Sequence, residues 1–161
     1  MKIKAISLTQ PWATLMAIEA KKYETRGWYT NHRGPTAIHA AKGFPKEAQA
    51  LCLEEPFCSV LRAVGYNLIT DLPLGCILAV GNLNTVYKTT YVARQLASQE
   101  IAFGDYSAGR YAYQFLAMQR LAIPIPAKGA LGFWDWEAPE GVLEYPGRII
   151  KAQEYDSRAL A

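Results

Sequence analysis

The stretch that decides the fold runs over residues 8–26, LTQPWATLMAIEAKKYETR, and its first half predicts a helix. A polar residue followed by Pro11 is typical of a helix start, because the first turn requires no backbone N–H from proline. Trp12 and Leu15 then recur at helical spacing, which favours packing into a core over binding a ligand. We expect this helix to end near Lys21.

The second half of the stretch predicts a strand and brings three charged residues together. Lys21, Glu24 and Arg26 lie where the helix gives way to extended chain, and residues two apart in a strand share one face. Two cations beside one carboxylate can bind phosphate or a polar base edge, and the carboxylate can also move a proton. A surface ion-pair group is the alternative interpretation of the same spacing.

Outward from this stretch, alternating residues 2–8 predict an opening strand, and a turn is expected at residues 31–35. Further strands are expected at residues 36–40, 75–86, 110–118 and 131–136, with a bulge at Gly81 and Asn82. Helices are expected over residues 46–64, interrupted at Pro56, and over residues 90–99. Strands interleaved with two or three helices, without regular alternation, predict an α+β fold around a small barrel.

Length, charge and cysteine content narrow the class of protein. With 161 residues, 51% of them hydrophobic, a single domain is expected. Residues 1–50 hold eight basic and three acidic side chains, so an anionic ligand should meet this half, although a solvated basic face would have the same composition. Three cysteines without a Cys-x-x-Cys pair and only two histidines predict neither a metal site nor a cofactor. The absence of an apolar leader or membrane span favours a cytoplasmic protein.

Aromatic and cationic residues share segments, which suits the stacking of unpaired bases. Trp28 and Tyr106 flank loops that also carry Arg33 and Arg110. His39 lies in an expected strand, where it lines a pocket or donates a structural hydrogen bond.

Several segments in the right order resemble the ASCH domain, named for activating signal cointegrator-1 homology. They are LTQPWA at residues 8–13, KKYETR at 21–26, WYT at 28–30, RGP at 33–35, GCILAV at 75–80, GRYAY at 109–113, and PIPAKG at 124–129 with Trp134. The resemblance implies a PUA-like small mixed β-barrel with flanking helices and a cleft next to the first helix. The ASCH domain is then expected over residues 1–137, and residues 138–161 form a C-terminal extension that packs on the domain or is partly disordered.

The family signature Gly-x-Lys-x-x-Glu-x-Arg matches at Lys21, Glu24 and Arg26, whereas Glu19 stands where glycine is usual. The resemblance implies a function linked to nucleic acids, and some members are hydrolases. One relative is an amidohydrolase that acts on acetylated cytidine through the motif lysine, and its branch has threonine at the position of Glu24.

We therefore expect a nucleic-acid-binding protein that holds RNA or another single strand, or DNA, in a cleft beside the first helix. The candidate contacts are Gln10, Trp12, Lys21, Glu24, Arg26, Trp28, Arg33, His39, Tyr106, Arg110 and Lys128. In one alternative the chain is a small hydrolase of a modified nucleoside or RNA, with Lys21 and Glu24 as the catalytic pair. In the other it is a protein-interaction domain.

Overall fold

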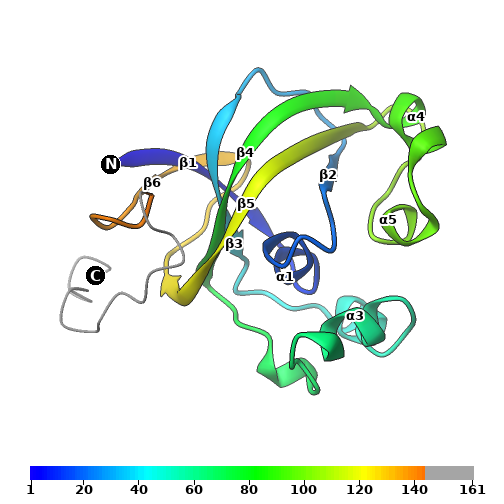
Figure 1. The fold of residues 1–161 in the computed structure, drawn as a ribbon, viewed down its shortest axis with the longest axis horizontal. Coiled ribbons are helices and arrows are strands. Elements are labelled where there is room, and N and C mark those ends of the chain that lie inside the picture. Colours follow the sequence, from blue (N-terminus) through cyan, green and yellow to red (C-terminus); the bar gives the residue numbers. More distant parts are fainter. Residues whose placement is uncertain (144–161) are drawn as a thin grey trace.

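The computed structural model describes residues 1–143, and its six strands form one mixed sheet that curls into a half-barrel (Figure 1). The strands are β1 (Lys2–Leu8), β2 (Tyr23–Arg26), β3 (Gly34–Ala40), β4 (Cys76–Lys88), β5 (Tyr111–Pro126) and β6 (Phe133–Glu137). They lie in the order β2-β5-β4-β3-β1-β6, with β1 and β3 parallel and the other neighbours antiparallel. The α+β class with a small mixed barrel is confirmed. Most of the expected extension, residues 144–161, lies outside the described residues.

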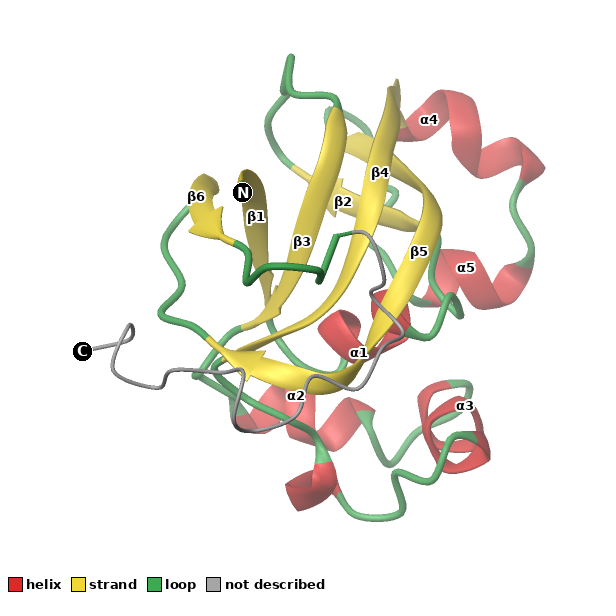
Figure 2. Cartoon of the chain, turned by 60° about the vertical axis from the view of Figure 1, so that its left-hand side comes forward, coloured by secondary structure: helices red, strands yellow, loops and turns green. Residues whose placement is uncertain are grey.

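Short helices cover the hollow and one end of the sheet (Figure 2). They are α1 (Trp12–Ala17), α2 (Lys46–Leu51), α3 (Phe57–Ala63), α4 (Thr89–Val92) and α5 (Ser98–Ala102), with 3-10 turns η1 (Ile69–Asp71) and η2 (Ala93–Gln95). The expected interruption at Pro56 separates α2 from α3. Among the described residues, no helix is long and apolar enough to cross a membrane.

Three buried clusters hold these elements together. Ile6, Ile38 and Tyr113 pack with α1 inside the curl of the sheet. A second cluster joins β1, β3, β4 and β5 to β6 and includes Val142. The third consists of side chains from α1 and α3 and from the residues that directly follow α2, η1 and α5, namely Leu15, Cys52, Phe57, Leu61, Leu72 and Phe103. This third cluster joins the helices that line the candidate site.

The first helix is shorter than expected, because the chain turns left-handed directly after it. α1 ends at Ala17, and Glu19 has a φ of 61°. The Lys21 amide then donates to the carbonyl of Leu15 at 3.0 Å, which closes the turn. A left-handed residue after the helix is usually glycine, since a side chain is disfavoured there, so the structure explains why glycine suits this position.

Two other expectations about elements need correction. The single helix expected over residues 90–99 is wrong, because Leu96 and Ala97 are extended and divide the segment into α4, η2 and α5. The strand expected over residues 110–118 continues to Pro126, because it pairs with β4 along the length of both strands. The expected bulge is confirmed by a register shift between Val80 and Asn82.

Candidate functional site

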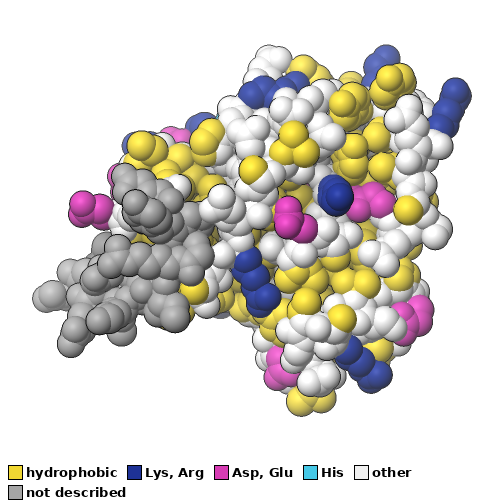
Figure 3. All heavy atoms as spheres, in the orientation of Figure 1, with side chains coloured by type: hydrophobic (Ala, Val, Ile, Leu, Met, Phe, Trp, Pro, Cys, Tyr) yellow, Lys and Arg dark blue, Asp and Glu magenta, His cyan; other side chains and the backbone are white. Residues whose placement is uncertain are grey.

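A cleft of about 370 Å³ lies between β2 and the helices. Its walls come from α1, β2, α2, α3 and α5, and it is lined by Trp12, Lys21, Glu24, Thr25, Leu51, Phe57, Ala102, Phe103, Gly104 and Asp105. The helices supply the apolar and aromatic walls, while the charged groups come from the start of β2 and the loop after α5. In Figure 3, acidic and basic side chains lie beside one another near the middle of the face turned toward the viewer, with hydrophobic side chains around them.

Lys21 is the most unusual side chain of the cleft. It is 2% exposed, and its Nζ has no hydrogen-bond partner among the described residues. Burial lowers the pKa of Lys21, and the nearby carboxylates of Glu24 and Glu100 only partly oppose that shift. A buried amino group is costly unless it finds a hydrogen-bond acceptor.

Glu24 and Arg26 form a pair in which the cation holds the carboxylate. Arg26 Nε donates to Glu24 Oε1 at 2.9 Å, and Arg26 Nη2 donates to the Ser7 carbonyl at 2.8 Å. Glu24 is 9% exposed and lines the cleft with Lys21. The structure thus brings the three predicted residues together. Arg26, however, donates hydrogen bonds to Glu24 and to the backbone of β1 and does not line the cleft.

Glu100 on α5 anchors the start of β2. Its carboxylate accepts hydrogen bonds from the amides of Lys22, at 3.0 and 3.2 Å, and of Tyr23, at 3.0 Å. The Tyr106 hydroxyl lies 3.5 Å from Glu100 Oε1, and burial raises the pKa of Tyr106, which keeps the phenol protonated. Tyr106 therefore contacts Glu100 and is not one of the residues that line the cleft.

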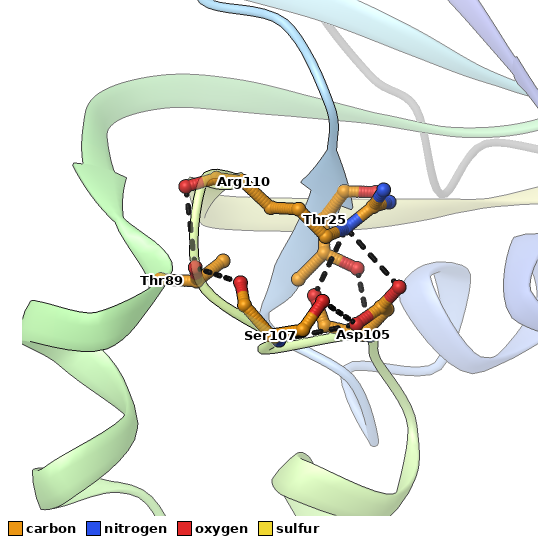
Figure 4. Close-up of polar contacts among 5 residues, drawn as sticks. All are labelled: Thr25, Thr89, Asp105, Ser107 and Arg110. Atoms are coloured by element: carbon orange, nitrogen blue, oxygen red, sulfur yellow. Dashed lines mark hydrogen bonds and ion pairs between the residues drawn. The ribbon is translucent and has the colours of Figure 1, made fainter.

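The loop after α5 is held by Arg110, as Figure 4 shows. Arg110 Nε donates to the Asp105 carbonyl at 3.2 Å and lies 3.4 Å from Asp105 Oδ2, while Nη2 donates to the Thr25 carbonyl at 3.3 Å. The Asp105 amide donates to Thr25 Oγ1 at 3.0 Å. Arg110 consequently positions two residues of the cleft wall and does not line the cleft itself.

Three other predicted contacts lie outside the cleft. Gln10 is fully buried, and its side chain bonds to the Pro73 carbonyl and to the amide and hydroxyl of Thr14. Trp28 is 38% exposed and packs edge-on against aromatic rings of β5 and β6. Arg33 donates to the carbonyls of its own turn and lies over the Tyr29 ring.

His39 and Lys128 line a separate cavity of about 820 Å³. His39 Nε2 lies 2.9 Å from the Ala127 carbonyl, and Nδ1 lies 2.9 Å from Ser7 Oγ. A carbonyl can only accept, so Nε2 donates and Nδ1 accepts from the Ser7 hydroxyl. Burial lowers the pKa of His39, which agrees with this neutral ring. The bonds of His39 tie β3 to β1 and to the segment after β5.

Sequence reasoning missed several residues of the site. Thr25, Phe57, Phe103 and Asp105 line the cleft, and Glu100 anchors it. Only Asp105 carried a signal, because it lies in a loop bounded by two glycines. Within residues 1–143, no group of three or more His, Cys, Asp or Glu side chains is placed to hold a metal ion.

Comparisons with known proteins agree with this architecture. No model of a protein family matches the sequence. Activating signal cointegrator 1 from Mus musculus and from Homo sapiens are each 27% identical to this chain over 133 residues. The matched region covers 83% of this chain but only 22% of the length of each relative. The fold is similar to ASCH from Zymomonas mobilis, at 13% identity and a TM-score of 0.51, over 88% of this chain and 91% of that one. A serine-to-alanine variant of that protein is 12% identical to this chain and has a TM-score of 0.50. The match covers 88% of this chain and 92% of the variant. Sequence similarity and fold similarity together support an ASCH domain in this chain.

Proposed function

We propose that this domain binds single-stranded RNA and holds one nucleotide in the cleft beside α1. The observation that carries the proposal is the Lys21 ammonium, which is buried in the cleft without a hydrogen-bond acceptor among the described residues. A nucleotide offers such acceptors as phosphate oxygens and as carbonyl oxygens of its base. The relationship to ASCH domains supports an RNA-binding role.

The cleft walls match the parts of a nucleotide. Lys21 donates to a phosphate or carbonyl oxygen, and Glu24, held at one oxygen by Arg26, accepts from an exocyclic amino group through the other. Trp12 and Phe57 also line the cleft, with ring centroids 6.4 Å apart, and offer apolar surface to a base. The volume of about 370 Å³ lies within the range of small-ligand pockets.

An unpaired strand suits this cleft better than a duplex. A base can enter an enclosed pocket only if it is free of its partner, and recognition of RNA sequence mostly uses such unpaired bases. The proposal therefore predicts a preference for single-stranded over duplex RNA.

Fluorescence anisotropy with a labelled ten-nucleotide RNA tests the proposal. Lys21→Met should weaken binding at least tenfold, because an acceptor of the ligand loses a charged donor in a desolvated site. Lys46→Met is the matched control, since Lys46 is exposed at the start of α2 and does not line the cleft. Equal binding by the native domain and Lys21→Met, or no binding by the native domain, would overturn the proposal.

One observation favours a second candidate function, the hydrolysis of an N-acylated nucleoside. The lowered pKa of Lys21 beside the carboxylate of Glu24 is typical of catalytic groups. Glu24 would take a proton from water as the water oxygen attacks the acyl carbon, and Lys21 would donate to the carbonyl oxygen. The C–N bond would then break as the nucleoside nitrogen takes the proton from Glu24. Turnover of acylated nucleosides that is lost in Glu24→Gln would establish this activity, and lack of turnover by the folded native domain would exclude it for those substrates.

A further inference from the structure

The outer face of the sheet next to the cleft carries a row of tyrosines. We name Tyr23 on β2, Tyr87 on β4 and Tyr91 on α4 the tyrosine row. The ring centroids of Tyr23 and Tyr87 are 6.5 Å apart, and those of Tyr87 and Tyr91 are 5.9 Å apart at an interplanar angle of 20°. Tyr91 is 63% exposed, so the row ends in a ring that faces solvent.

Alternation along β5 explains why this face lies outside the core. Tyr113 and Phe115 are buried inside the curl, so the residues between them point to the other side. On that side Gln114 is paired with Tyr23 of β2, and Ala112 is paired with Tyr87 of β4.

Amide groups lie beside the tyrosine row. Gln114 Nε2 lies 3.3 Å from the Tyr23 hydroxyl, and Gln114 Oε1 accepts from Asn84 Nδ2 at 3.1 Å. Side-chain amides pair with the polar edges of bases, and aromatic rings stack on base faces. A partly exposed sheet face with both kinds of group is therefore suited to unpaired bases.

The charges around the row favour a polyanion. Lys22 and Lys88, which are exposed, adjoin Tyr23 and Tyr87 in the sequence, and the exposed Arg94 follows Tyr91 in η2. In Figure 3, Lys or Arg side chains project beside hydrophobic side chains in the region that α4 occupies in Figure 1. The nearby carboxylate, that of Glu100, already accepts backbone hydrogen bonds.

We propose that the tyrosine row stacks the nucleotides that adjoin the one in the cleft, so that a single RNA strand crosses β2. This inference rests on the proposed function. Tyr23 and Glu24 are neighbours on β2, an edge strand of the sheet, and Glu24 lines the cleft. A strand of RNA therefore needs to cross only this edge to reach both surfaces.

The test compares RNA lengths in three tyrosine variants. Tyr91→Ala should weaken binding of a ten-nucleotide RNA by about 5- to 100-fold, the loss expected for one stacked base. The same variant should leave binding of a mononucleotide unchanged, and Tyr91→Phe should retain native binding because it keeps the ring. Tyr29→Ala, which removes a half-exposed tyrosine outside the row, is the control.

Two results would overturn the inference in different ways. If Tyr91→Ala binds the ten-nucleotide RNA like the native domain while Lys21→Met does not, the tyrosine row is not part of the site and the proposed function stands. If the native domain binds neither RNA nor mononucleotide, the proposed function fails and this inference fails with it. Thermal unfolding of each variant confirms that the comparison is between folded proteins.

Discussion

Arg26 Nε donates a 2.9 Å hydrogen bond to Glu24 Oε1, so Arg26 holds the carboxylate that lines the cleft with Lys21. Lys21 Nζ is buried in the same cleft without a hydrogen-bond acceptor among the described residues. A fold that keeps a buried ammonium in this state gives up stability, which is a common property of binding and catalytic sites.

Replacement of Lys21 should separate stability from binding. Lys21→Met keeps a chain of similar length and removes the buried amino group, so the free energy of unfolding should rise by about 1–3 kcal/mol. Denaturant unfolding of the native domain and the variant measures the difference. A less stable Lys21→Met domain would show that the ammonium contributes to folding and would contradict this account of the cleft.

Replacement of Glu19 should relieve strain at the end of α1. Because Glu19 has a φ of 61°, Glu19→Gly should stabilise the domain by about 0.5–1 kcal/mol. Glu47→Gly is the control, since Glu47 is exposed in the first turn of α2 and glycine there should cost up to about 1 kcal/mol. Thermal melts of the two variants should therefore shift in opposite directions, and a lower melting temperature for Glu19→Gly would contradict the prediction.

Gly129 should not tolerate even a methyl group. A Cβ at this position would lie 2.6 Å from His39 Cε1 and 2.7 Å from Ser7 Oγ, and hydrogen bonds hold both side chains in place. We expect Gly129→Ala to lower the free energy of unfolding by about 1–3 kcal/mol. Gly43→Ala, where a Cβ meets no atom within 4 Å, should leave stability unchanged or slightly raised. Equal stability of the two variants would contradict the observed packing over the Ser7–His39 pair.

Stability should fall as the medium becomes mildly acidic. Burial lowers the pKa of His39 and of His32 in the folded state, so below the unfolded value of about 6.5 the unfolded chain binds more protons than the folded one. The free energy of unfolding should therefore decrease as pH falls from 7.5 to 5.5. His39→Gln should make the free energy of unfolding less dependent on pH, because it removes one of the two histidines. His32→Gln measures how much of the pH dependence comes from His32. A native domain that becomes more stable on acidification over this range would contradict the neutral His39.

Local sequence patterns predicted much of the fold. The positions of β1, β3 and β6 follow from alternation and β-branched content, and Pro56 predicts the division between α2 and α3. The end of α1 could not be predicted in this way, because the left-handed Glu19 has no signal of its own beyond the glycine expected there. The division at Leu96 and Ala97 depends on α5 reaching β2, which is a tertiary constraint.

The candidate site was predictable only where its residues are close in sequence. Lys21 and Glu24 lie three positions apart, and their chemistry is visible in the motif. Phe57 and Phe103 come from distant segments with ordinary core patterns, so only the folded chain places them at the cleft. Charge alone also gave no sign that Arg33 and Arg110 donate to backbone carbonyls of the protein.

The most direct test of the central claim is a ¹⁵N NMR titration of the tryptophan indoles with a short single-stranded RNA. The chain has four tryptophans, of which Trp12 lines the cleft while Trp134 and Trp136 lie on β6. The account predicts a saturable shift of the Trp12 indole, little change at the two β6 indoles, and loss of the Trp12 shift in Lys21→Met. Saturable shifts confined to the β6 indoles, or an unchanged Trp12 signal at saturating RNA, would contradict a nucleotide site at this cleft.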